Sequence, residues 1–148
     1  AKREKATEKA EKTITPTLDT GSPAAQFNQA KGLLNKGQYA AAEEAFKHYL
    51  AEYPSGKEAK AARVHLGEAQ LKQGKTKEAQ ASFAKAYQTN SKGIEGARAL
   101  LGFGESLGAG DKDKKKACTV LKKLHKDFPK NEETTGKADD LMKKYKCS

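Results

Sequence analysis

A ten-residue segment recurs in this chain at an interval of 37 residues. It reads GQYAAAEEAF over residues 37–46 and GKTKEAQASF over residues 74–83. Both copies place Ala five residues and Phe nine residues after the glycine, and a third, looser copy covers residues 110–121. Repeats of about 20–50 residues are typical of folds in which each unit buries its apolar face only against its neighbours.

The apolar residues around these copies recur every three or four positions, as in Phe27, Ala30 and Leu34. This spacing is typical of amphipathic helices, and no segment alternates apolar and polar residues with a period of two. The pattern therefore predicts an all-α chain of seven helices. We expect three helix–turn–helix units at about 23–56, 57–93 and 94–130, and a capping helix at about 134–146.

The N-terminal region differs from the rest of the chain in composition. Residues 1–12 are mostly Ala, Lys and Glu, and residues 13–23, TITPTLDTGSP, carry Pro and Gly, which interrupt helices. We expect a flexible basic tail and linker over residues 1–22, followed by the repeat domain over 23–148. Ser22 can cap the first helix, and Pro23 is tolerated in its first turn.

The net charge of +10 raises the question of an anionic partner. Residues 110–130 hold eight Lys against three Asp, but elsewhere Lys and Glu alternate along the predicted helix faces, as on a solvated surface. A nucleic-acid module using this lysine-rich turn is an alternative, but we expect a general preference for acidic partners and no specific nucleic-acid binding. Residues 99–110 contain Glu105 and are too short to span a bilayer, so no membrane insertion is expected.

The sequence contains one motif that is also found at catalytic sites. Residues 104–108 fit G-x-S-x-G, but a nucleophilic serine needs a strand-to-helix turn, whereas here the pattern before Ser106 is helical. His48, His65 and His125 lack metal-ligand spacing, and no phosphate-binding loop occurs. We therefore expect no enzyme activity, no cofactor and no metal site.

Two cysteines occur in the chain, Cys118 and Cys147. The predicted helices before and after the turn that follows Pro129 are antiparallel, which places the two thiols roughly 16 and 21 Å from this turn, close enough for them to meet. We expect a disulfide between them, with two buried thiols as the alternative. A disulfide would indicate an oxidising compartment.

The repeat resembles the tetratricopeptide repeat, although its spacing of 36–37 residues exceeds the usual value of about 34. The matching positions are the small residues Ala30, Gly67 and Gly104, the Gly-x-Tyr of Gly37 and Tyr39, and Ala42, Phe46 and Pro54. The resemblance implies a right-handed superhelix whose first helices line a concave groove that binds an extended or helical peptide. On this register the expected groove residues are Phe27, Lys31, Leu34, Val64, Glu68, Leu71, Leu101 and Glu105.

Residues 23–147 more narrowly resemble the repeat domain of the Tol–Pal-associated periplasmic cell-division coordinator family. The matching motifs are Tyr53-Pro54, Phe128-Pro129, the LGE of 66–68, the FGES of 103–106, and Ala117-Cys118 with Cys147. The sequence departs from the family pattern at Thr76, where Tyr is usual, and at Ser91, where Pro is usual.

This narrower resemblance implies a non-catalytic periplasmic scaffold. Its expected partners are a TolA-like protein and a peptidoglycan synthase, so that it would coordinate outer-membrane constriction with wall synthesis during cell division. The family oligomerises through an upstream coiled coil that does not occur in these 148 residues. The alternative is an outer-membrane assembly protein or another cell-envelope adaptor of the same fold.

Overall fold

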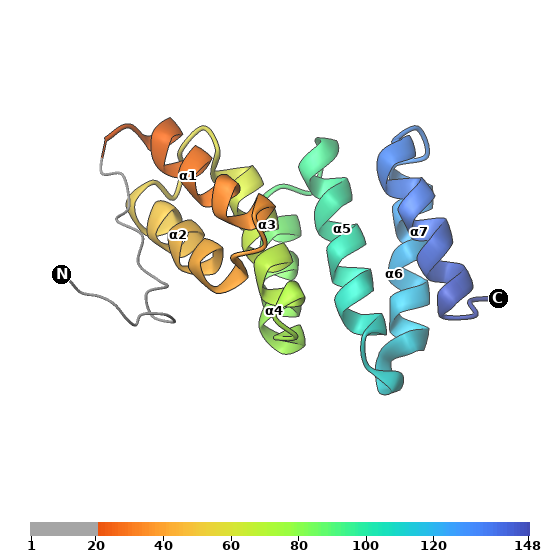
Figure 1. The fold of residues 1–148 in the computed structure, drawn as a ribbon. Coiled ribbons are helices and arrows are strands. Elements are labelled where there is room, and N and C mark those ends of the chain that lie inside the picture. Colours follow the sequence, from red (N-terminus) through yellow and green to blue (C-terminus); the bar gives the residue numbers. More distant parts are fainter. Residues whose placement is uncertain (1–20) are drawn as a thin grey trace.

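The computed structural model describes residues 21–148, so the tail expected over residues 1–20 lies outside the described residues. Seven α-helices, one short 3-10 helix and no strand make up the described part, which confirms the predicted all-α class (Figure 1). The helices are α1 (Pro23–Asn35), α2 (Tyr39–Glu52), α3 (Ala59–Lys72), α4 (Thr76–Thr89), α5 (Gly93–Gly108), η2 (Asp111–Asp113), α6 (Lys114–Asp127) and α7 (Glu132–Lys144).

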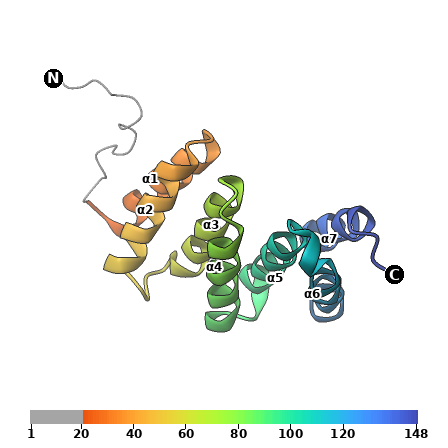
Figure 2. The ribbon, with the colours of Figure 1, turned by 90° about the horizontal axis from the view of Figure 1, so that it is seen from below.

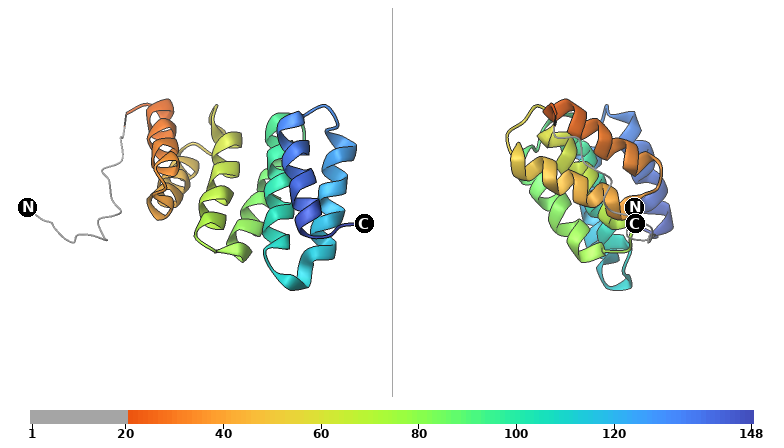
Figure 3. Two further views of the ribbon diagram at one scale, coloured as in Figure 1. Left: turned by 45° about the vertical axis from the view of Figure 1, so that its right-hand side comes forward. Right: turned by 60° about the vertical axis from the view of Figure 1, so that its left-hand side comes forward.

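The helices pair into three helix–turn–helix units that stack in sequence order (Figure 3). Each unit consists of an inner and an outer helix: α1 with α2, α3 with α4, and α5 with α6. Helix α3 contacts both α1 and α5, and α5 also contacts α7. The inner row is therefore α1, α3, α5 and α7, and the outer helices α2, α4 and α6 pack behind it (Figure 2).

The ends of the helices follow from local sequence. The Ser22 hydroxyl accepts a hydrogen bond from the amide of Ala25 at 3.0 Å, which confirms the predicted cap, and Pro23 opens α1. Gly37 and Gly74 lie within the turns of the first two units at φ values of +79° and +80°, a conformation that favours glycine. The third unit carries two extra residues in this turn, and η2 accommodates them.

The core between the first two units is aromatic. Phe46 is fully buried, and its ring centroid lies 6.0 Å from that of Phe27 and 5.5 Å from that of His65. Tyr49 is also fully buried and lies edge-on to Phe27 at 5.9 Å. These edge-on and tilted contacts add to the stability gained by burying the rings.

Close packing between the later units depends on glycines. The ring of Phe83 lies so close to Gly67 on α3 and Gly102 on α5 that a Cβ at either glycine would come within 3.0 Å of it. A Cβ at Gly104 would likewise come within 2.8 Å of Leu121. Phe83, on the outer helix α4, thus fills space left by the missing side chains of two inner helices.

A buried carboxylate links the first unit to the second. Glu43 on α2 is 1% exposed and accepts hydrogen bonds from Gln70 at 3.1 Å, Gln73 at 2.8 Å and Lys75 at 3.0 Å. Lys47 forms a further ion pair with it at 3.1 Å. Burial alone would raise the pKa of Glu43, but these four donors outweigh burial and hold the pKa at about 2.

Helix α7 begins two residues earlier than the sequence pattern predicted. The Asn131 side chain accepts a hydrogen bond from the amide of Thr134 at 3.1 Å and so caps the helix. Glu132 and Glu133 then occupy the first turn, where acidic side chains interact favourably with the helix dipole. The prediction overlooked the Asn131 cap because it placed residues 130–133 in the turn.

We predict that Gly102→Ala lowers the free energy of unfolding by about 1–3 kcal/mol, because the added Cβ overlaps the buried ring of Phe83. Gly136→Ala is the matched control, since it lies within α7 with no atom close to the added Cβ. This control should leave stability unchanged or raise it by about 0.5–1 kcal/mol through helix propensity. Urea unfolding of both variants measures the difference, and equal effects would contradict the proposed packing role of Gly102.

We predict that Glu43 contributes stability at neutral pH that is lost in acid. Its folded pKa of about 2 lies below its ordinary value of 4.5, so the contribution is complete above pH 4.5 and disappears as the pH falls towards 2. The contribution should be on the order of 2 kcal/mol, because the partly exposed Lys47 and Lys75 are screened by solvent.

The substitution Glu43→Gln should therefore destabilise the protein at pH 7, with a difference from wild type that shrinks as the pH is lowered. Glu44→Gln is the control, because Glu44 is 65% exposed. Urea titrations over the acid range measure both. A pH-independent effect of Glu43→Gln would show that the charge of Glu43 is not what stabilises the fold.

Candidate functional site

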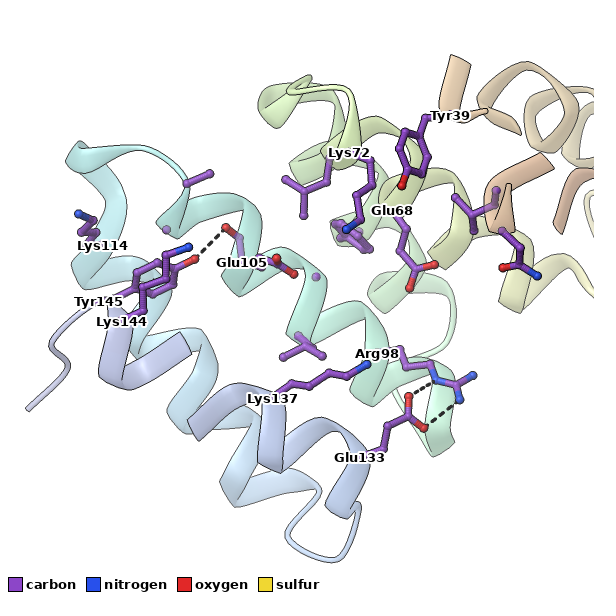
Figure 4. A pocket seen from close by; sticks show the side chains of 18 residues that line it. Tyr39, Glu68, Lys72, Arg98, Glu105, Lys114, Glu133, Lys137, Lys144 and Tyr145 are labelled. Atoms are coloured by element: carbon purple, nitrogen blue, oxygen red, sulfur yellow. Dashed lines mark hydrogen bonds and ion pairs between the residues drawn. The ribbon is translucent and has the colours of Figure 1, made fainter. Parts of the chain in front are cut away.

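The inner row of helices encloses a groove of about 980 Å³ (Figure 4). Residues of α1, α3, α5 and α7 make up most of its lining, together with Phe83 of α4, Tyr39 at one end and Lys114 near the other. The groove therefore crosses all three units and reaches the last helix, and it is long enough to hold a peptide segment.

The floor of the groove is apolar. Leu34 on α1, Leu71 on α3 and Leu101 on α5 lie along it at intermediate exposure. Leu71 packs against the cluster around Phe83, and Leu101 packs against the cluster that covers α6 and α7. Half-buried leucines on a rigid support can take up an apolar side chain of a partner without rearranging the core.

The rim of the groove is charged. Its lining contains five basic side chains, Lys72, Arg98, Lys114, Lys137 and Lys144, and three acidic ones, Glu68, Glu105 and Glu133. The lining thus carries a net positive charge, and most of its basic side chains lie towards the α7 end of the groove.

One ion pair joins α5 to α7 at the groove. The Arg98 guanidinium donates two hydrogen bonds to the Glu133 carboxylate, from Nε at 3.1 Å and from Nη2 at 3.0 Å (Figure 4). This paired geometry raises the pKa of Arg98 and lowers the pKa of Glu133. Since these two charges neutralise each other, the charge that a ligand meets is set by the four lysines of the lining against Glu68 and Glu105.

The C-terminal end of the groove is built around Tyr145. Its ring lies against Gly108, where an added Cβ would come within 3.0 Å, and its hydroxyl donates to the Glu105 carbonyl at 3.3 Å (Figure 4). Burial and the nearby Glu105 carboxylate raise the pKa of the Tyr145 hydroxyl. Gly108 therefore plays the same part for Tyr145 as Gly67 and Gly102 play for Phe83.

The predicted disulfide is present. Cys118 on α6 and Cys147 after α7 are bonded, with their Cα atoms 5.6 Å apart. The bond ties the chain immediately after Tyr145 to the outer helix α6, and so holds the groove end of α7 in place.

The structure divides the eight predicted groove residues into three groups. Leu34, Glu68, Leu71, Leu101 and Glu105 line the groove together. Phe27 and Val64 instead belong to the core. Phe27 is 8% exposed because α2 and α3 cover it, and Val64 is 1% exposed because it packs in the cluster around Phe83. Lys31 is exposed on α1 and is not part of the lining.

The side of the groove formed by α7 was missed by the sequence prediction. Glu133, Lys137, Lys144 and the adjoining Tyr145 line it, and Glu133 pairs there with Arg98 of α5, whereas the sequence prediction gave α7 only a capping role. The sequence does contain a signal that α7 is an inner helix. Tyr53-Pro54 precedes the inner helix α3, and the similar Phe128-Pro129 precedes α7. Lys114, assigned to the lysine-rich turn, also belongs to the lining.

Other sequence features have simple structural positions. Ser106 lies inside α5, is 1% exposed and donates a hydrogen bond to the Phe103 carbonyl at 2.8 Å. Among residues 21–148, no group of three His, Cys, Asp or Glu side chains is placed to hold a metal ion. None of the helices in the described part combines the length and apolar character that a bilayer span requires.

Comparison with known proteins identifies both a family and a fold. The family model described as YfiO, outer membrane lipoprotein, matches residues 19–146. The crystal structure of a tetratricopeptide repeat protein from Parabacteroides merdae ATCC 43184 is similar, with a TM-score of 0.64 and 22% identity. At this identity the likeness shows the fold alone. No curated protein matches the sequence.

The similarity to the solved structure covers 76% of this chain and 42% of that one, so the chain spans less than half the length of its structural neighbour. The shared fold confirms the tetratricopeptide-repeat superhelix predicted from the 37-residue repeat. The narrower resemblance to the Tol–Pal coordinator family is not confirmed, because the family model that matches is that of the YfiO lipoproteins.

We predict that replacing Cys118 and Cys147 with Ser lowers the free energy of unfolding by about 3 kcal/mol, on the chain-entropy model for a loop of this length. Hydrogen exchange should become faster in the last turns of α7, since the bond holds that end in place. Urea unfolding and exchange followed by mass spectrometry measure the two effects. Two titratable thiols in the denatured but unreduced wild-type protein would refute the bond.

Proposed function

The chain belongs to the YfiO family of outer membrane lipoproteins, and from this premise we propose that it is a non-catalytic protein-interaction scaffold of the bacterial cell envelope. Its groove would bind a peptide segment of a partner protein on the periplasmic side. The disulfide supports this location, since such bonds persist in oxidising compartments.

The observation that carries the proposal is the continuous groove along four inner helices. A row of half-buried leucines lies between charged side chains on α3, α5 and α7. Apolar anchors with a charged surround are the usual means by which helical repeat surfaces recognise a peptide. The buried core below the groove makes the surface rigid, so that binding needs little ordering of the scaffold.

The charge of the groove favours a partner segment with acidic residues. Lys137 and Lys144 on α7 are exposed, and neither forms an ion pair within residues 21–148. An acidic side chain next to an apolar one in the partner could pair with these ammonium groups while its neighbour contacts Leu101. Electrostatic complementarity of this kind contributes mainly to partner choice and association rate.

Two roles in the envelope fit such a scaffold. The first is an adaptor in outer-membrane assembly, which is compatible with a family of outer membrane lipoproteins. The second candidate is the Tol–Pal role, with a TolA-like protein and a peptidoglycan synthase as partners. One observation favours it, the bond between Cys118 and Cys147, since both cysteines occur in the motif that carried the resemblance.

Site-specific photocrosslinking tests the proposal and separates the two roles. A photoreactive residue at Glu105 in the groove should form adducts with an envelope protein, whereas the same residue at Lys85 on α4 should not, because Lys85 is exposed on the outer row. Adducts with an outer-membrane assembly component support the first role. Adducts with a TolA-like protein or a peptidoglycan synthase support the second, and equal adducts from both positions contradict the groove.

We predict that the double variant Lys137→Glu with Lys144→Glu binds the crosslinked partner about 10-fold or more weakly, because a like charge then faces the acidic segment. The matched control is Lys77→Glu with Lys85→Glu on α4, which changes the net charge equally outside the groove. Calorimetric titration of the full chain measures both. Equal losses in the two variants would show that net charge, and not the groove, determines the affinity.

A further inference from the structure

A row of lysines covers the exposed face of α6. Lys115, Lys116, Lys122, Lys123 and Lys126 are all exposed, and Thr119 completes the row. Their spacing of one, three or four residues places them on one side of the helix, opposite the buried residues Ala117, Leu121 and Leu124. The row extends over about 16 Å at 1.5 Å per residue.

Most of this positive charge is available to a partner. Lys123 pairs with Asp127 at 2.8 Å, and Lys116 lies 3.8 Å from Asp113. Within residues 21–148, the ammonium groups of Lys115, Lys122 and Lys126 form no ion pair. Three unpaired positive charges on one helix face repel each other and so lower the stability of the helix. A partner of opposite charge would offset this repulsion.

The other outer helices do not carry such a row. Helix α2 exposes Glu44 and Glu52 beside Lys47, and α4 exposes Glu78 beside Lys77. The three helices occupy equivalent places in the stack, so the fold does not require lysines at these positions. The charge of α6 is therefore a property of this one surface.

We propose that this face of α6 docks on the anionic phospholipid surface of a membrane. A basic face on an amphipathic helix is suited to anionic headgroups, and each lysine near such a surface contributes to binding. The face contains lysines and one threonine and no apolar residue, so the contact is electrostatic and does not insert into the bilayer.

Two observations favour phospholipid over nucleic acid. No aromatic side chain is exposed between the lysines, and single-stranded nucleic acids are bound by stacking bases on aromatic rings. Cys118, on the same helix, is in a disulfide, which indicates an oxidising compartment rather than the cytosol.

The position of the row has a geometric consequence for the groove. The lysines lie opposite the buried residues of α6, and α6 packs against α5 and α7, which line the groove. Figures 1 and 2 show the ribbon of α6 behind these two inner helices. A chain docked through α6 would leave the groove facing away from the membrane. The same domain could then bind a membrane surface and a soluble partner at once.

The test measures how the full chain of 148 residues partitions onto vesicles. Vesicles of phosphatidylcholine with about one third phosphatidylglycerol are compared with vesicles of phosphatidylcholine alone at moderate salt. The test variant is Lys115→Gln, Lys122→Gln, Lys126→Gln. The control variant Lys60→Gln, Lys77→Gln, Lys85→Gln removes the same charge from exposed positions on α3 and α4. Circular dichroism checks that both remain folded.

The proposal predicts that the wild type sediments with the anionic vesicles and not with the neutral ones. The α6 variant should lose about 10- to 100-fold in partition coefficient, and the control should lose far less. Equal losses in the two variants would overturn the proposal, since net charge would then explain the binding. It would also be overturned if the wild type bound a DNA duplex through the same three lysines more tightly than it binds the anionic vesicles at the same salt concentration.

Discussion

The ring of Phe83, held between Gly67 and Gly102, is the contact on which the geometry of the stack depends. An aromatic ring in direct contact with two helix backbones leaves little freedom in the distance between α3 and α5. That distance determines how far apart Leu71 and Leu101 lie, and hence whether the two leucines form one continuous floor. The shape of the groove is therefore a consequence of core packing on its far side.

The last helix repeats this arrangement at the end of the stack. The ring of Tyr145 lies against Gly108, and the pair of Arg98 with Glu133 and the disulfide after Tyr145 hold α7 beside α5 and α6. Helix α7 occupies the place of the inner helix of a fourth unit, with no outer helix behind it in the described part of the chain. It therefore both covers the end of the core and contributes Lys137 and Lys144 to the groove.

Much of this fold could be predicted from the sequence, because the patterns that specify its helices and units are local and recur along the chain. The 37-residue match between Gly37 and Gly74 gave the units, and helical spacing gave the buried faces. The cysteine pair followed from the geometry of one antiparallel turn. Each of these inferences needs no knowledge of contacts between distant segments.

The parts that could not be predicted depend on such contacts. Helical spacing shows that Phe27 lies on an apolar face but not that Phe46 and His65 cover it, so Phe27 was assigned to the groove. Gly104 was recognised as a small position, whereas the role of Gly102 depends on Phe83 of the preceding unit. The pair of Arg98 and Glu133 joins residues 35 apart. Only the packed arrangement of α5 and α7 brings their side chains together.

The most direct test of the groove is hydrogen exchange of the full chain with and without its bound partner peptide. The proposed binding surface lies on the inner helices α3, α5 and α7, and α2 and α4 pack behind this row. Binding should therefore slow exchange along α3, α5 and α7 far more than along α2 and α4, which contribute only Tyr39 and Phe83 to the lining. Protection confined to α2 and α4 would contradict the central claim that the inner row is the surface that recognises a partner.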